Sequence, residues 1–292
     1  MTSLSHHRDT TYVGSNATNH TFDTPTPIDL SVQIGSGSVQ VTATNTEVTQ
    51  IEITGPHADD VVVEQHDDQI RVTDPHQIYR PFGLSQALQV TVRIPAHSGL
   101  STRLSSADLR TEGPLGACTL ASGSGAVLVD RTGTLDITTG SGTVSIHTVD
   151  GYLRAKTGSG DLTVAEVTGT ADLISGSADL HLQTVGGAVT ARTGSGDLRI
   201  ATVGADVTTT TGSGHTEVGG IRRGRLMSRS ASGDVAITVG HGTPTWTDLH
   251  SVSGAIAHNL QPLGEPADGQ EHVELRVRTL SGIIRVRHEV LV

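Results

Sequence analysis

Short runs of alternating apolar and polar residues, separated by glycine-rich turns, make up most of the chain. The first clear run is Ile-Asp-Leu-Ser-Val-Gln-Ile at residues 28–34. A period of two residues is typical of a β-strand with one buried face. Similar runs follow at irregular spacing, so the pattern predicts an N-terminal β-strand region over residues 28–104.

From residue 105 the runs repeat with a period of about 18 residues. The heptapeptide Gly-Ser-Gly-Asp-Leu-Thr-Val at 158–164 returns as Gly-Ser-Ala-Asp-Leu-His-Leu at 176–182 and as Gly-Ser-Gly-Asp-Leu-Arg-Ile at 194–200. Each unit contains a second turn midway, which gives the order turn, strand, turn, strand. A fixed period of this size indicates a chain that stacks one small unit many times.

Aligned units place like residues in columns, as stacked parallel strands require, because each residue lies beside its equivalent one coil along. Such strands are about 4.8 Å apart, and parallel crossovers are right-handed in almost all known cases. We therefore predict an all-β, single-stranded parallel β-solenoid (β-helix) with ~18-residue coils, right-handed, with two faces and irregular N-terminal strands. The predicted structural core includes Leu162, Val164, Val167, Leu180, Leu182, Val185, Leu198, Ile200, Val203 and Cys118.

The pattern changes at both ends of the chain. Residues 1–27 are polar and aperiodic, which predicts a flexible N-terminal lead. Residues 74–87 carry Pro, Gly and aromatic residues, which favours a loop that caps the strand region, with a binding loop as the alternative. We expect solenoid repeats over 105–292, interrupted by a Pro- and Gly-rich insertion at 257–272. The last strands, within 274–287, alternate apolar residues with arginine, which predicts a protected terminal capping strand; the alternative is an arginine patch for an acidic partner.

Composition narrows the functional classes. The chain has 292 residues with a net charge of −11, and residues 1–219 hold 23 acidic against 11 basic residues. This charge argues against a nucleic-acid partner. No stretch approaches the ~20 apolar residues of a membrane helix, and residues 1–13 contain no apolar signal-peptide region. We therefore expect no membrane span and a cytoplasmic location, or the cell surface if export information has been removed.

One column of aspartates is the strongest candidate for a metal site. Asp161, Asp179 and Asp197 occupy the same place in successive units, where like charges repel by roughly 1 kcal/mol per pair in water. Either the carboxylates accept neighbouring backbone N–H groups and fix the turns, or they hold a row of cations such as Ca²⁺. The nine-residue calcium repeat is absent, so we expect turn fixing, with no metal and no cofactor.

No nucleophile stands out. The serines of the turns recur in every unit, whereas a catalytic serine is unique and paired with a base. The single cysteine, Cys118, falls in an inward column, which favours an apolar filler over a reactive thiol. Adjacent coils could bring several acidic residues together on one face, as a polysaccharide-active enzyme requires. Sugar-binding clefts usually contain exposed aromatic side chains, and the few aromatic residues of this chain lie far apart in the sequence, which argues against such an enzyme. These acidic residues are Asp136, Asp150, Glu166 and Asp172.

The repeats resemble a known family. The Ser-Gly-Asp turns, the segment Val-Thr-Val-Arg-Ile-Pro at 90–95 and the segment Val-Arg-Thr-Leu-Ser-Gly-Ile-Ile at 277–284 are similar to those of the bacterial putative-adhesin family, a β-strand-repeat domain of unknown function. The resemblance implies a β-solenoid and carries over no catalytic residues. The architecture also resembles that of bactofilins, whose solenoids polymerise end to end, which adds a homo-oligomer through the solenoid ends to the expected partners.

These observations predict a non-enzymatic scaffold or interaction protein that presents rows of Thr, Ser and Asp on rigid faces to an unknown protein or surface partner. Two alternatives stay open. One is a polysaccharide-active β-helix enzyme, and the other is a cell-surface adhesin proper.

Overall fold

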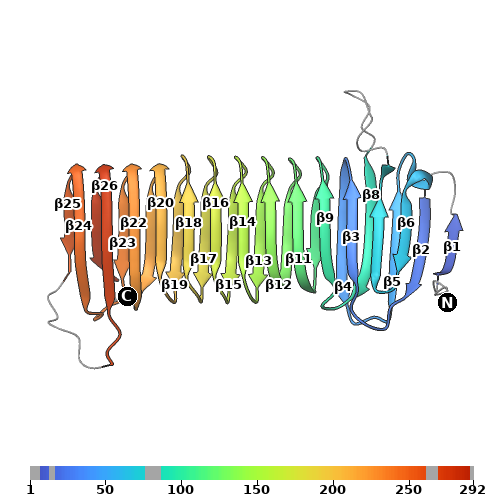
Figure 1. Cartoon of the computed structure of the whole chain (residues 1–292), viewed down its shortest axis with the longest axis horizontal. Helices are drawn as coiled ribbons and strands as arrows, with labels where there is room; N and C mark the ends of the chain where they lie inside the picture. Colours follow the sequence, from blue (N-terminus) through green and yellow to red (C-terminus); the bar gives the residue numbers. More distant parts are fainter. Residues whose placement is uncertain (1–6, 13–16, 76–86, 261–268, 290–292) are drawn as a thin grey trace. The chain divides into compact units, whose positions relative to one another are not determined.

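The computed structural model describes residues 7–12, 17–75, 87–260 and 269–289, and its regular elements are β-strands apart from one short 3-10 helix, η1 (Ala58–Asp60). The chain divides into two compact units, residues 1–150 and 151–292. In each unit the strands lie side by side in two sheets (Figure 1). The pairs within the C-terminal unit are parallel, whereas the N-terminal unit contains both parallel and antiparallel pairs. The described residues contain no helix long and apolar enough to cross a membrane.

The strands of the N-terminal unit form two sheets. The first sheet has the order β6-β7-β3-β9-β11-β12, and the second has the order β1-β2-β5-β8-β4-β10-β12-β13. The long strand β12 belongs to both sheets. The bounds are β1 (His7–Tyr12), β2 (Ala17–Asp23), β3 (Asp29–Ile34), β4 (Gly37–Thr44), β5 (Val48–Thr54), β6 (Val62–His66), β7 (Gln69–Thr73), β8 (Leu88–Pro95), β9 (Gly99–Leu104), β10 (Asp108–Glu112), β11 (Pro114–Ser122), β12 (Val127–Thr139) and β13 (Val144–Val149).

The expectation of a flexible lead is wrong for residues 7–12, which form β1, and for residues 17–23, which form β2. This strand pairs antiparallel with β5 over its whole length, and the side chain of Phe22 is buried. Pairing satisfies the backbone of a segment whose own sequence shows no alternation, so the tertiary partner decides its structure. Residues 1–6 and 13–16 of the expected lead, and 76–86 of the expected capping loop, lie outside the described residues.

The order of the coils differs from the order of the chain at the N-terminal end. Strand β3 pairs with β7 on one side and with β9 on the other, and β4 lies in the same way between β8 and β10. The β3–β4 coil, which comes first in the sequence, is therefore inserted between two coils that follow it.

The C-terminal unit repeats one coil of two strands. Its first sheet has the order β14-β16-β18-β20-β22-β26-β24, its second has the order β15-β17-β19-β21-β23-β27-β25, and all of these pairs are parallel. The bounds are β14 (Leu153–Thr157), β15 (Leu162–Val167), β16 (Ala171–Ser175), β17 (Leu180–Val185), β18 (Val189–Thr193), β19 (Leu198–Val203), β20 (Val207–Ser213), β21 (Thr216–Ile221), β22 (Gly224–Ser232), β23 (Val235–Val239), β24 (Thr245–Ser253), β25 (Ile256–Asn259), β26 (Val273–Ser281) and β27 (Ile284–His288).

Columns of apolar side chains fill the space between the two sheets of this unit. Leu162, Leu180 and Leu198 are direct register partners, and all three are buried. Full burial of such a side chain contributes about 1.5–3 kcal/mol, and each coil supplies several. The other buried members of these columns on β15, β17 and β19 are Val164, Val167, Leu182, Val185, Ile200 and Val203.

The turns explain the Gly-Ser-Gly sequence. The hydroxyl of Thr157 donates a hydrogen bond to the carbonyl oxygen of Gly160 at 2.5 Å, which closes one turn. In a later coil, a Cβ atom at Gly196 would overlap the carbonyl oxygen of Ala178 in the coil before it. Glycine at this place therefore allows successive turns to stack at the spacing of the strands.

The array does not end with the arginine-rich strands, so that expectation is wrong. Strand β26 lies between β22 and β24, and β27 lies between β23 and β25. The coil of β24 and β25 is therefore the end coil of the unit, although it precedes the inserted coil in the sequence. Of the insertion expected at 257–272, residues 257–259 belong to β25, and 261–268 lie outside the described residues.

Candidate interaction surfaces

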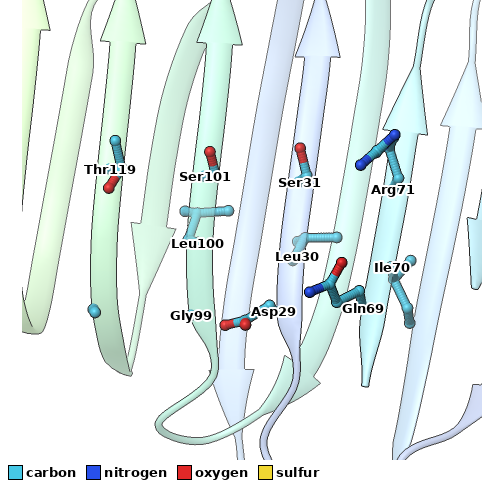
Figure 2. A pocket seen from close by; sticks show the side chains of 11 residues that line it. Asp29, Leu30, Ser31, Gln69, Ile70, Arg71, Gly99, Leu100, Ser101 and Thr119 are labelled. Carbon is cyan, nitrogen blue, oxygen red and sulfur yellow. The ribbon is translucent and has the colours of Figure 1, made fainter. Parts of the chain in front are cut away.

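The outward face of the first sheet in the N-terminal unit contains a hollow of about 330 Å³ over β7, β3, β9 and β11. Figure 2 shows Arg71, Ser31, Ser101 and Thr119 in one row across these strands, and the register pairs them in that order. We call this site the outer-face hollow; its outward-facing residues are Asp29, Ser31, Gln69, Arg71, Gly99, Ser101, Ala117 and Thr119.

Small residues make the floor of the outer-face hollow. Gly99 lies beside Asp29 in the register, and a Cβ atom at Gly99 would overlap the carboxylate oxygen of Asp29. Asp29 and Gln69 are register partners at one end of the hollow, and Arg71 lies two residues further along the strand of Gln69, beside Ser31 (Figure 2). These side chains are exposed and supply a carboxylate, an amide and a guanidinium, so the hollow offers hydrogen bonds to a polar ligand.

Sequence reasoning missed the outer-face hollow. Asp29, Gln69, Gly99 and Thr119 lie far apart in the chain, and they meet only because β3 is inserted between β7 and β9. No local pattern signals this insertion. The residues carry no periodic or motif-like spacing that would have identified them together.

The aspartate column forms a ladder of hydrogen bonds between coils. The carboxylate of Asp161 accepts the backbone N–H of Asp179 at 3.0 Å, Asp179 accepts that of Asp197 at 2.8 Å, and Asp197 accepts that of His215 at 2.8 Å. Each side chain therefore satisfies a backbone donor 18 residues further along. This bond compensates for the repulsion between stacked carboxylates, because hydrogen bonds to charged groups are the stronger kind.

The ladder continues through a histidine. Nδ1 of His215 accepts the backbone N–H of Asp234 at 3.3 Å, and the carboxylate of Asp234 accepts the N–H of Ile283 at 2.9 Å. The last bond reaches the inserted coil, which joins it to the regular repeats. Within the described part of the chain, no three His, Cys, Asp or Glu side chains are grouped closely enough to hold a metal ion.

The acidic residues considered for catalysis do not form a pair in either unit. In the C-terminal unit Glu166 is on β15 and Asp172 is on β16, which belong to different sheets, and both side chains point outward. In the N-terminal unit Asp136 is an outward residue of β12, whereas Asp150 follows β13 and binds Arg131 at 2.9 Å. The Arg131 hydrogen bond lowers the pKa of Asp150, so this carboxylate is ionised rather than available as a general acid.

Cys118 is buried on β11 and accepts a hydrogen bond from the Thr132 hydroxyl at 3.2 Å. Burial raises the pKa of its thiol above the ordinary value. A raised pKa lowers the fraction of thiolate, which is the reactive form.

The arginines of the inserted coil bind acidic residues of the same unit. Glu274 accepts Arg225 of β22 and Arg276 of its own strand, each at 2.6 Å, and Asp234 accepts Arg285 at 2.9 Å. The hydrogen bond from Arg225 is the main cause of the lowered pKa of Glu274. Arg285 therefore connects the inserted coil to the residue before β23, and Arg225 connects β22 to the inserted coil, whereas Arg276 pairs within its own strand. The expectation of a terminal edge strand did not include these ion pairs.

Comparison with known proteins identifies the fold family. Residues 28–241 match the family model of Toastrack DUF4097. The chain is similar to a putative adhesin from Parabacteroides merdae ATCC 43184, with 12% identity, a TM-score of 0.53, and coverage of 93% of this chain and 96% of the other. The chain is also similar to a putative adhesin from Bacteroides fragilis NCTC 9343, with 13% identity and a TM-score of 0.41. That match covers 94% of this chain and 98% of the other. No curated protein sequence matches the chain.

Proposed function

The chain belongs to the Toastrack DUF4097 family, and from this premise we propose that it is a non-enzymatic interaction protein whose N-terminal unit binds a partner at the outer-face hollow. One observation carries the proposal. Asp29, Gln69 and Arg71 gather exposed and chemically different polar groups over a floor of small residues on a flat sheet. Within the described part of the chain, neither charged side chain, Asp29 nor Arg71, forms an ion pair.

The chemistry of the outer-face hollow suits a partner with a carboxylate and neighbouring hydroxyl or amide groups. The guanidinium of Arg71 binds a carboxylate through two parallel hydrogen bonds, and Asp29 accepts hydroxyl or amide hydrogens. Backbone pairing on both sides of β3 holds the floor rigid. A rigid site loses little conformational entropy on binding, which favours affinity from few contacts.

Affinity capture with matched variants tests the proposal. The wild-type protein, Arg71→Glu and Arg103→Glu are immobilised, and proteins and glycans captured from the native cell envelope and lysate are compared. Arg103 is also an exposed outward residue on β9 but does not line the hollow, so it controls for charge. We expect a ligand that binds the wild type and Arg103→Glu and is lost with Arg71→Glu. Equal capture by all three proteins, or turnover of a small substrate, would contradict the proposal.

A cell-surface adhesin is the second candidate function. The fold similarity to the putative adhesin from Parabacteroides merdae supports it, since that match covers nearly the whole chain. Protease treatment of intact cells that express the native gene tests this candidate. Digestion of the protein on intact cells supports an adhesin, and full protection together with recovery only in the cytosol contradicts it.

A further inference from the structure

The end coil of the C-terminal unit exposes the side chains that other coils bury. Ile256 on β25 is 42% exposed, whereas its register partner Ile284 on β27 is 0% exposed. Leu249 on β24 is partly exposed, whereas its partner Val277 on β26 is buried. Among the described residues β24 pairs only with β26, and β25 only with β27, so each has one free edge.

The edge of β24 lacks most of the usual protection against strand pairing, and its one acidic residue, Asp248, lies 3.9 Å from Arg278 of β26. Natural edge strands carry Lys, Pro, bulges or inward charges. Strand β24 reads Thr-Trp-Thr-Asp-Leu-His-Ser-Val-Ser and contains no Lys, Arg or Pro. Its outward side chains Trp246 and Val252 are 54% and 67% exposed. A strand of nine residues whose outer face exposes these two large apolar side chains is a good template for another strand.

The sequence of β24 is complementary to itself when read in the opposite direction. Around Leu249 as the centre, an antiparallel copy places Trp246 opposite Val252 and Asp248 opposite His250. Hydroxyl residues also meet, because Thr247 falls opposite Ser251 and Thr245 opposite Ser253. Directly opposite residues of antiparallel strands point to the same side, so each pair shares one face of the sheet.

We propose that two copies of this protein form a two-fold dimer in which β24 of one copy pairs antiparallel with β24 of the other around Leu249. A two-fold contact uses the same surface on both copies, which is what the self-complementary strand provides. Asp248 of each copy binds His250 of the other, Trp246 packs on Val252, and the partly exposed inward residue Leu249 is covered by its symmetry mate. The dimer covers the free edge of β24 and forms whether or not the outer-face hollow binds a ligand.

A charge exchange tests both the dimer and its register. His250→Asp places two aspartates opposite each other twice, and Asp248→His places two histidines there. We expect light scattering after size exclusion to give the mass of two chains for the wild type and of one chain for each single variant. The double variant Asp248→His/His250→Asp restores both pairs and the two-chain mass. Unchanged far-UV circular dichroism spectra show that the substitutions leave the fold intact, whereas loss of the dimer lowers the melting temperature because association stabilises the folded state.

Mixing the two single variants gives a sharper result. A chain with His250→Asp carries aspartate at both positions, a chain with Asp248→His carries histidine at both, and together they form two complementary pairs. We expect the mixture to form a heterodimer, detected by native mass spectrometry of one labelled and one unlabelled chain. A wild type that stays monomeric at about 100 μM, or a double variant or mixture that stays monomeric while the wild type dimerises, overturns the proposal.

A cysteine at the symmetry centre provides an independent measurement. Opposite residues of antiparallel strands have Cα atoms about 4.5–5.5 Å apart, which suits a disulfide. We expect Leu249→Cys to form a covalent dimer under mild oxidation. Thr190→Cys, on the interior strand β18, forms no covalent dimer under the same oxidation and is the control. Absence of cross-linking in a wild-type-like dimer would overturn the register.

Discussion

The carboxylate of Asp179 accepts the backbone N–H of Asp197 at 2.8 Å, across the turns of two successive coils. The turn that carries these aspartates is therefore a contact between coils. Its aspartate satisfies a donor that the next coil presents, and the next aspartate does the same in turn. The unit that repeats in the sequence is thus also the unit of hydrogen bonding.

Removal of one ladder carboxylate should weaken the stack locally. We expect Asp179→Ala to lower the free energy of unfolding by about 1 kcal/mol, because the N–H of Asp197 loses its acceptor. Asp179→Asn keeps an acceptor oxygen and removes a like charge, so it should be close to neutral. Urea unfolding measures both, with the outward Thr163→Ala as control. An equal loss for Ala and Asn would contradict the ladder.

A charge in the core should unfold several coils together. Leu180 is 1% exposed between Leu162 and Leu198, so Leu180→Asp places a carboxylate in a dry column. We expect a loss above about 4 kcal/mol and a lower melting temperature, since a buried charge without a partner is costly. Leu180→Met conserves volume and should cost less than about 1.5 kcal/mol. A cooperative melt unchanged by Leu180→Asp would show that this column is not the core.

Acid should weaken the attachment of the inserted coil. The N–H of Ile283, and then Arg285, lower the pKa of Asp234. A lowered pKa in the folded state means stability that is present above the unfolded pKa of about 3.9 and lost as the pH falls through the folded value. We expect Asp234→Asn to reduce the loss of stability between about pH 5 and pH 2. Arg285→Ala should also reduce this acid-induced loss of stability. Denaturant unfolding at each pH measures the free energy of unfolding of the wild type and both variants. A pH dependence of the variants equal to that of the wild type would contradict this role of Asp234.

The turn between β26 and β27 should control the end coil. Gly282 has a φ of 150°, and a Cβ atom there would overlap the carbonyl oxygen of Gly233. We expect Gly282→Ala to loosen the inserted coil and to increase proteolysis within β24 and β25, which pair only with it among the described residues. Gly242→Ala is the control, because its φ is 72° but nothing lies within 4 Å of the added atom. Equal cleavage of both variants would contradict this expectation, because it would show that the positive φ shared by both positions, and not the overlap with Gly233, causes the loosening.

The periodicity of the sequence determined the β-solenoid, because a parallel stack repeats one set of contacts every coil. Leu162, Leu180 and Leu198 recur at a fixed spacing, and the structure places them side by side. The same spacing predicted that the aspartates fix turns, although not that each binds the following coil. The two columns of strands follow from the two turns in each unit.

Only the tertiary structure decided the order of the coils. The β3–β4 coil is inserted between two coils that follow it in the sequence, and this insertion brings Asp29, Gln69 and Thr119 into one hollow. The β26–β27 coil is inserted between the β22–β23 coil and the β24–β25 coil, and this insertion leaves β24 at an end of its sheet. The N–H and C=O groups that pair parallel strands are the same in every residue, so a coil can dock between any two neighbours of matching register. Which neighbours it takes depends on burial summed over the whole unit, and no local stretch of sequence contains that sum.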